Sequence, residues 1–132
     1  MKVNGESYRT IWMEGSTVHM IEQNLLPFKF QIFQARNYKE TCHAIRTMVI
    51  RGAGAIGAAA GYAMAQAFIE FGDDISVIDK AKEEIEGTRP TARNLFYAVD
   101  RVYHAGLQSR AIACDEAERI ADDDARDSRA IG

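Results

Sequence analysis

The segment from residue 55 to residue 71 constrains the fold of this chain more than any other, because it is apolar on almost every side of a helix. A helix of that composition is stable only when other elements surround it. Gly57 and Gly61 lie one turn apart and would let a neighbour approach closely, and Gly72 is a natural stop signal at the C-terminal end. We therefore predict a central helix that is buried on all sides.

The patterns on either side of this segment predict one α+β domain. Tyr8–Met13 and Thr17–Gln23 alternate in polarity around a turn at Glu14-Gly15-Ser16, which is typical of a hairpin, and residues 28–33 predict a third strand. Helical patterns follow at 38–49, about 55–71, about 74–86, about 91–107 and about 114–128. No repeat or linker interrupts them, so we expect a small three-stranded antiparallel sheet followed by a bundle of about five helices.

The start of the central helix carries a glycine triplet that permits two interpretations. Gly52, Gly54 and Gly57 form the G-x-G-x-x-G pattern of dinucleotide-binding proteins, which needs a strand before it and a second strand that ends in an acid. Residues 75–79 could supply that second strand. Residues 38–49, however, resemble an amphipathic helix, with Asn37 as N-cap and Glu40 three residues later. We therefore favour the other interpretation, a phosphate-facing turn at Arg51-Gly52-Ala53.

A second turn of similar character precedes the helix at about 91–107. Pro90, with Thr88 or Thr91, supplies a helix start signal, which places Arg89 at a helix N-terminus. Free backbone N–H groups and the helix dipole favour an anion there, and a guanidinium adds a bidentate donor. An isolated arginine at such a place is most simply a solvated surface residue. Arg51 stands just before a helix in the same way, and the pair of cations favours an anion site.

These motifs together resemble the N-terminal part of the methylthioribose-1-phosphate isomerase family, which also includes ribose-1,5-bisphosphate isomerase and the regulatory subunits of initiation factor 2B. The resemblance extends over nearly the whole chain and in order. Its segments are Tyr8–Trp12, Ile21–Pro27, Ala44–Ala53, Ala55–Gly57 and Thr88–Phe96. Gly54 departs from the pattern, because the family usually has proline there, and glycine reduces the rigidity of the turn.

The resemblance implies an aldose–ketose isomerisation. The ring of a 1-phosphorylated ribose opens, and a hydrogen moves from C2 to C1 to give the 1-phosphoulose. It also implies that Arg51, Gly52, Ala53 and Arg89 bind the sugar phosphate, and that no cofactor takes part. The family's catalytic Cys and Asp belong to a C-terminal nucleotide-fold-like domain, so residues 1–132 are expected to be an N-terminal domain without catalytic residues, cut from a longer protein. That full-length protein is expected to form a homodimer.

Composition excludes several other classes of function. The net charge of −3 offers no basic stripe for nucleic acid, and no apolar run reaches the ~18–20 residues of a membrane span. Two cysteines give no disulfide framework, so we expect a cytoplasmic protein without a signal peptide. The histidines, the cysteines and the acidic run at 122–124 have no metal-ligand spacing. We therefore expect structural roles for Cys42 and Cys114, and Cys42 is expected to be a small core residue because it lies on the apolar stripe of the helix at 38–49.

Three hypotheses remain after this reading: part of an isomerase, a regulatory subunit of the initiation factor type, and a nucleotide-binding dehydrogenase domain. Retention of both Arg51 and Arg89 favours the isomerase, because a protein–protein module would have no chemical need for them. The substituent at C5 of the sugar stays open, and with it a ribose-1,5-bisphosphate or deoxyribose-1-phosphate isomerase, because the pocket that discriminates these sugars is expected to be shared with the absent domain.

Overall fold

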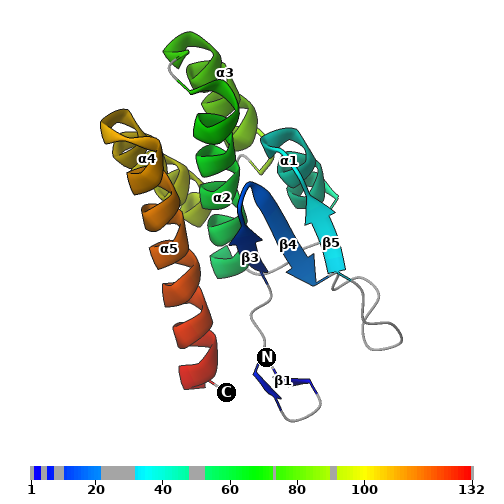
Figure 1. Cartoon of the computed structure of the whole chain (residues 1–132). Coiled ribbons are helices and arrows are strands. Elements are labelled where there is room, and N and C mark those ends of the chain that lie inside the picture. The colour runs from blue at the N-terminus through cyan, green and yellow to red at the C-terminus, as the bar shows by residue number, and fades with distance from the viewer. Residues whose placement is uncertain are drawn as a thin grey trace.

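The computed structural model describes residues 2–3, 6–7, 11–21, 32–47, 53–72, 74–89 and 92–131. It describes the surroundings of side chains at 11–20, 33–47, 55–72, 74–89 and 92–122. Five strands and five helices occur in these ranges, with the strands first and the helices after them, as the sequence predicts for an α+β domain (Figure 1).

The predicted hairpin is present as β3 (Ile11–Glu14) and β4 (Thr17–Ile21), which pair antiparallel. Gly15 has a φ of 61°, a left-handed conformation that the turn requires and glycine adopts without strain. A two-stranded ribbon, β1 (Lys2–Val3) with β2 (Glu6–Ser7), precedes the sheet and was not predicted.

The third strand lies later in the chain than the alternation at 28–33 predicts. β5 covers Ile32–Ala35 and pairs antiparallel with β4, so the sheet order is β3-β4-β5. Its register sets Phe33 beside Met20 and Ala35 beside Val18, so that one face of the sheet contributes to the core. Only Ile32 and Phe33 are common to the predicted and observed strands, and residues 22–31 lie outside the described part of the chain.

The five predicted helices are all present. They are α1 (Tyr38–Arg46), α2 (Ala53–Phe71), α3 (Ile75–Glu86), α4 (Arg93–Gln108) and α5 (Arg110–Ile131). Residues 75–79 are therefore helical, and their interpretation as a second strand of a dinucleotide fold is wrong. A helix also precedes the glycine triplet, since α1 ends at Arg46, although residues 48–52 are outside the described part.

Local hydrogen bonds explain the observed helix ends. The side chain of Asn37 accepts a bond from the Glu40 N–H at 2.9 Å, which confirms the predicted N-cap. Gly72 takes a φ of 58° just after α2, as the stop signal requires. α5 begins four residues earlier than predicted because the Ser109 hydroxyl accepts a bond from the Ile112 N–H at 3.1 Å. A serine of this kind is a recognisable N-cap that the sequence reading missed.

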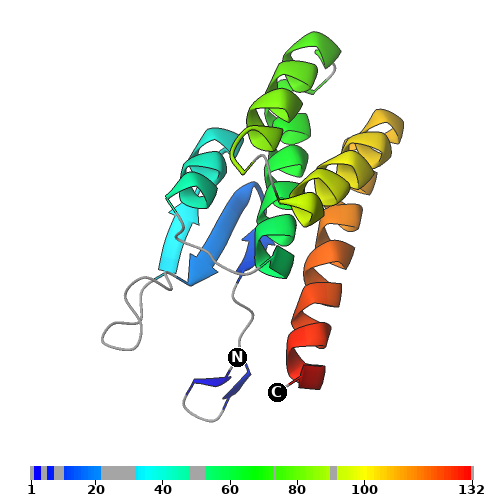
Figure 2. The same ribbon diagram turned by 180° about the vertical axis from the view of Figure 1, so that it is seen from behind.

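α2 lies at the centre of the molecule, as its composition predicts. It has the sheet and α1 on one side and α3, α4 and α5 around the remainder, a placement visible from both directions in Figures 1 and 2. Every residue from 55 to 68 is buried. Among the described residues, no helix is long and apolar enough to cross a membrane.

The side chain of Gln66 in α2 forms hydrogen bonds to the sheet region and to α1. Gln66 is fully buried, and its amide nitrogen donates to the carbonyl oxygens of Ser16 at 2.8 Å and Ala35 at 3.0 Å. Its amide oxygen accepts from the hydroxyl of Thr41 in α1. One residue of α2 thus holds the β3–β4 turn, the end of β5 and the first helix in a fixed relation.

Candidate functional site

Arg89 lies in the bend that joins α3 to α4, and its side chain is half-buried. The bend is held by short-range hydrogen bonds. The Thr88 hydroxyl donates to the Ile85 carbonyl at 2.6 Å, and the Ala92 N–H donates to the Arg89 carbonyl at 2.9 Å. These bonds hold Thr88 against the end of α3 and join the Arg89 carbonyl to the N-cap residue of α4.

The helix start differs in detail from the prediction. α4 begins at Arg93 with Ala92 as the N-cap residue, so Thr88 does not cap it. The Thr88 hydroxyl is already used at the end of α3, where it satisfies the Ile85 carbonyl. No side chain caps α4 at Ala92. Alanine has no side-chain acceptor. The N–H groups at the positive end of the α4 dipole therefore receive no cap from the side chain of Ala92, which lies three residues after Arg89.

The first candidate turn lies at the start of α2. Ala53 is the first residue of that helix, two residues earlier than predicted, so it belongs to the helix rather than to the turn before it. Arg51 and Gly52 precede it in the sequence and lie outside the described residues. The first four N–H groups of a helix have no acceptor within the helix, which leaves donors at this point for an anion.

The two helix starts lie at the same end of the bundle. α2 and α4 run parallel, because successive residues of α2 approach successive residues of α4. A Cβ built on Gly57 would meet Asn94, one built on Gly61 would meet Ala98 and Val102, and the Phe68 ring reaches Gly106. Figure 2 shows the beginning of α4, in yellow, against the lower part of α2.

The parallel starts of α2 and α4 suit the binding of an anion, because both helices direct their positive ends to one region. Arg89 belongs to the bend just before α4, three residues before its N-cap residue Ala92. The convergence of Arg51 with Arg89 stays a prediction, because Arg51 is outside the described part of the chain.

Neither cysteine is suited to nucleophilic chemistry. Cys42 is fully buried, as predicted, and burial raises its pKa to about 12, with the Glu84 carboxylate adding to the effect. Burial also raises the pKa of the half-buried Cys114 thiol. Because the thiolate is the reactive form, these shifts disfavour both thiols as nucleophiles at neutral pH. Both are free thiols.

The histidines are separated in the structure. His43 is exposed while its neighbour Cys42 is buried, as their adjacency on one helix predicts. His19 stacks on Trp12 across the β3–β4 pair, with ring centroids 5.3 Å apart. Among the described side chains, no group of three or more His, Cys, Asp or Glu could hold a metal ion.

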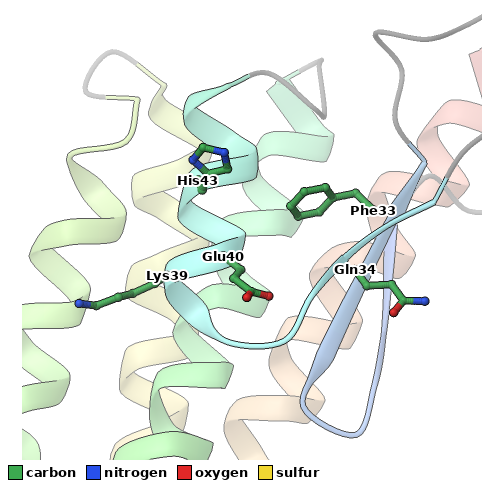
Figure 3. Close-up of a pocket in the computed structure, with 5 residues that line it drawn as sticks. All are labelled: Phe33, Gln34, Lys39, Glu40 and His43. Carbon is green, nitrogen blue, oxygen red and sulfur yellow. The ribbon is translucent and has the colours of Figure 1, made fainter.

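A surface hollow of about 470 Å³ lies between β5 and α1 (Figure 3). Its lining residues are Phe33, Gln34, Lys39, Glu40 and His43. The Glu40 carboxylate is engaged there with the Arg36 N–H at 2.7 Å, and it would repel a phosphate. Arg89 is not among the described residues that line the hollow.

The comparisons with known proteins agree with this geometry. No family model matches the chain. Methylthioribose-1-phosphate isomerase from Methylorubrum extorquens is 42% identical over 139 aligned positions, which cover 100% of this chain and 38% of that protein. The crystal structure of 5-methylthioribose 1-phosphate isomerase from Pyrococcus horikoshii superposes with a TM-score of 0.79 at 34% identity, over 87% of this chain and 36% of the other.

The chain is homologous to part of the methylthioribose-1-phosphate isomerases. It spans 38% of the length of the M. extorquens relative, so the remainder of such a protein has no counterpart here. The fold also occurs in the delta subunit of translation initiation factor eIF-2B from A. fulgidus, with a TM-score of 0.72 at 31% identity over 92% of this chain. Both branches of the family inferred from the sequence motifs are thus represented.

Proposed function

We propose that these residues form the N-terminal, substrate-phosphate-binding domain of a methylthioribose-1-phosphate isomerase. The identity of 42% along the whole chain is the observation that carries this proposal. The parallel starts of α2 and α4 support it independently, because they bring two helix ends and the Arg89 turn to one end of the bundle.

The reaction would convert 5-methylthioribose 1-phosphate into 5-methylthioribulose 1-phosphate, as in methionine salvage. Cleavage of the C1–O4 ring bond with protonation of O4 would leave C1 as a phosphorylated oxocarbenium carbon. The hydrogen on C2 then moves to C1 with its bonding electrons and the C2 hydroxyl loses its proton, which gives the ketone at C2 and keeps the phosphate on C1. The role of this domain is to hold the substrate by its phosphate. Arg51, Gly52, Ala53 and Arg89 supply guanidinium forks and backbone N–H groups, which suit the tetrahedral oxygens of a phosphate ester.

The groups that move the proton would belong to a second, nucleotide-fold-like domain after residue 132. We infer a catalytic Cys and Asp there, in a cytoplasmic homodimer that needs no cofactor. The raised pKa values of the Cys42 and Cys114 thiols support the placement of the reactive thiol elsewhere. Sedimentation of the full-length protein tests the dimer, and a monomer at micromolar concentration would contradict it.

Replacing Arg51 or Arg89 with lysine in the full-length protein tests the phosphate-binding role. Lysine keeps the charge but loses the planar fork. A hydrogen bond to a charged group contributes about 1.5–3 kcal/mol, so kcat/KM for methylthioribose 1-phosphate should fall about tenfold to a hundredfold. Thermal melting should shift little, because substitutions outside the core usually change stability by less than about 0.5 kcal/mol.

Arg110→Lys is the matched control for these variants. Arg110 is exposed and is the first residue of α5, which begins directly after the C-terminal end of α4. Its replacement should leave kcat/KM within about twofold of wild type. Wild-type kinetics in both Arg51→Lys and Arg89→Lys would show that neither guanidinium holds the phosphate. A collapsed melting temperature in both would assign them a structural role instead.

A regulatory subunit of the initiation factor 2B type is the second candidate. The similarity to the delta subunit structure from A. fulgidus favours it, although both the TM-score and the identity are lower than for the P. horikoshii isomerase. The same assay decides between them. A full-length protein that neither isomerises methylthioribose 1-phosphate nor binds it would favour the regulatory role.

A further inference from the structure

Gly57 lies at the point where α4 begins against α2. A Cβ at this position would lie 3.2 Å from the carbonyl oxygen of Asn94, 3.4 Å from its Cβ and 3.5 Å from its carbonyl carbon. Asn94 is the second residue of α4. Two of these three atoms belong to the backbone, so an added side chain at Gly57 would press on the α4 start itself rather than on a flexible side chain.

Gly61 lies one turn further along the same face of α2 and has different surroundings. A Cβ there would meet the Val102 Cγ2 at 3.5 Å, the Ile120 Cδ1 at 3.6 Å and the Ala98 Cβ at 3.8 Å. These are ordinary van der Waals distances to side-chain atoms. Of these two neighbouring glycines, Gly57 alone is required by the backbone of a neighbouring helix.

We propose that Gly57 is a positioning residue for substrate phosphate binding, since its lack of a side chain lets the start of α4 approach α2 closely. This inference rests on the function proposed above for the Arg51 and Arg89 turns. Gly57 follows Ala53 by four residues on α2, and Asn94 follows Arg89 by five. The close approach of Asn94 to Gly57 therefore sets how the first turn of α4 lies against the first turns of α2, the two helix starts proposed to face the phosphate.

The proposal also explains the third glycine of the G-x-G-x-x-G pattern without a nucleotide. In the dinucleotide fold that glycine serves close packing of helix against strand. Here it serves close packing of one helix against the start of another, and the segment that could have been the second strand is α3. The glycine pattern and the close packing thus occur in both folds, whereas the ligand proposed here is a sugar phosphate and not a dinucleotide.

A methyl group at Gly57 would displace the start of α4 by a few tenths of an ångström. Because hydrogen bonds weaken as their distances and angles depart from the ideal, a shift of this size should weaken phosphate binding roughly threefold to tenfold. Alanine has a higher helix propensity than glycine at both positions, so Gly57→Ala and Gly61→Ala gain helix stability equally. A loss confined to Gly57→Ala cannot arise from propensity.

The experiment is a double-mutant cycle in the full-length protein with Gly57→Ala, Arg89→Lys and the double variant, and with Gly61→Ala as control. The measured quantities are KM and kcat for methylthioribose 1-phosphate, the inhibition constant of inorganic phosphate, and the melting temperature. Gly57→Ala should raise KM and the phosphate inhibition constant, with kcat and melting temperature nearly unchanged. In the Arg89→Lys background its effect should shrink, because both variants act on one contact.

Several outcomes would overturn the inference, and they separate it from the proposed function. If Arg89→Lys weakens phosphate binding while Gly57→Ala leaves it unchanged, the positioning role is wrong and the binding role stands. The same conclusion follows if Gly61→Ala has an equal effect, or if the two effects are fully additive. If Arg89→Lys has no effect on KM or on phosphate inhibition, the proposed function fails, and the positioning role fails with it.

Discussion

Tyr38 and Cys42 lie in the interface of α1 with α2 and α3, where both titrate far from their usual range. Burial raises the pKa of Tyr38 to about 12, and its hydroxyl donates to the Glu84 carboxylate at 3.1 Å, which adds to the shift. The backbone N–H of Tyr38 donates to Glu70 at 2.8 Å, while burial raises the pKa of that carboxyl. The phenol and the thiol are therefore neutral in the folded protein well above neutral pH.

These shifts predict a loss of stability at alkaline pH. A folded-state pKa above the unfolded value gives stability that is complete below the unfolded pKa, about 9 for Cys and 10 for Tyr, and is lost as pH approaches the folded value. The free energy of unfolding should therefore fall as pH rises from about 9 to 12. Tyr38→Phe removes the phenol, so the free energy of unfolding of this variant, measured by urea titration, should fall less steeply above pH 10 than that of the wild type.

Tyr97→Phe is the control for Tyr38→Phe, because the Tyr97 side chain is 64% exposed. Its profile should follow that of the wild type throughout. An unchanged slope above pH 10 in Tyr38→Phe would show that the Tyr38 phenol does not contribute to the alkaline loss.

Single residues also show how far the sequence could be interpreted. Cys42 was assigned to the core because it lies on an apolar stripe, and that assignment is confirmed. The bond from the Tyr38 hydroxyl to Glu84 joins residues 46 positions apart and depends on how α1 meets α3. Periodicity places a residue on a face of its own helix, but it does not say which helix that face will meet.

At the scale of elements, the packing of α2 against α4 depends on glycine at more than one position along the two helices. Beyond Gly57 and Gly61, the Phe68 ring occupies the space beside Gly106, where an added Cβ would lie 2.2 Å from the ring Cε2. Phe68 is 2% exposed and packs against Tyr103 at 6.2 Å between ring centroids, so its ring has little room to move. Gly106 is thus required by the aromatic packing between the two helices.

Gly106→Ala should destabilise the protein relative to Gly61→Ala. Both substitutions gain up to about 1 kcal/mol of helix propensity, so their difference reports packing alone. Overpacking a core costs about 1–3 kcal/mol, whereas the Gly61 site accepts a methyl group at ordinary distances. Urea unfolding should therefore place Gly106→Ala about 1–3 kcal/mol below Gly61→Ala. Equal stabilities would mean that Phe68 moves aside at no cost.

The sequence predicted which helices and strands form better than it predicted the residues at which they begin and end. Long apolar periodicity located the helices, but the start of α4 differs by two residues because the Thr88 hydroxyl bonds back to α3 instead of capping forward. β5 differs because a strand of four residues is fixed by its register with β4 rather than by its own alternation. For the site, the position of Arg89 before a helix could be predicted, whereas the parallel course of α2 and α4 and the close approach at Gly57 needed the tertiary structure.

At the scale of the whole molecule, Gln66 connects the sheet to the helical bundle. Its amide satisfies two buried or part-buried carbonyls and the Thr41 hydroxyl, which come from three different elements. In Figure 1 the sheet otherwise meets the bundle only along α1, α2 and the neighbouring part of α5. This hydrogen-bond set gives the sheet a specific orientation as well as a buried face.

Gln66→Leu should destabilise the whole protein by about 2–4 kcal/mol, because each buried polar group left without a partner costs about 1–3 kcal/mol and leucine satisfies none of them. The matched control is Gln108→Leu, since Gln108 is exposed at the end of α4, and its effect should stay within about 0.5 kcal/mol. Denaturant titration measures both. Equal small effects would show that water or a shifted backbone replaces the Gln66 contacts.

Residues 1–132 alone should fold cooperatively but not catalyse isomerisation. The core is closed within the described residues, since α2 is buried from 55 to 68 by elements of this same chain, so a single thermal transition is expected. Protonation of O4 and deprotonation of the C2 hydroxyl need a group whose pKa lies near the working pH. The two thiols here are shifted away from that range by burial. Turnover of methylthioribose 1-phosphate by the purified 132 residues, at a rate near that of the full-length protein, would place the catalytic groups in this domain after all.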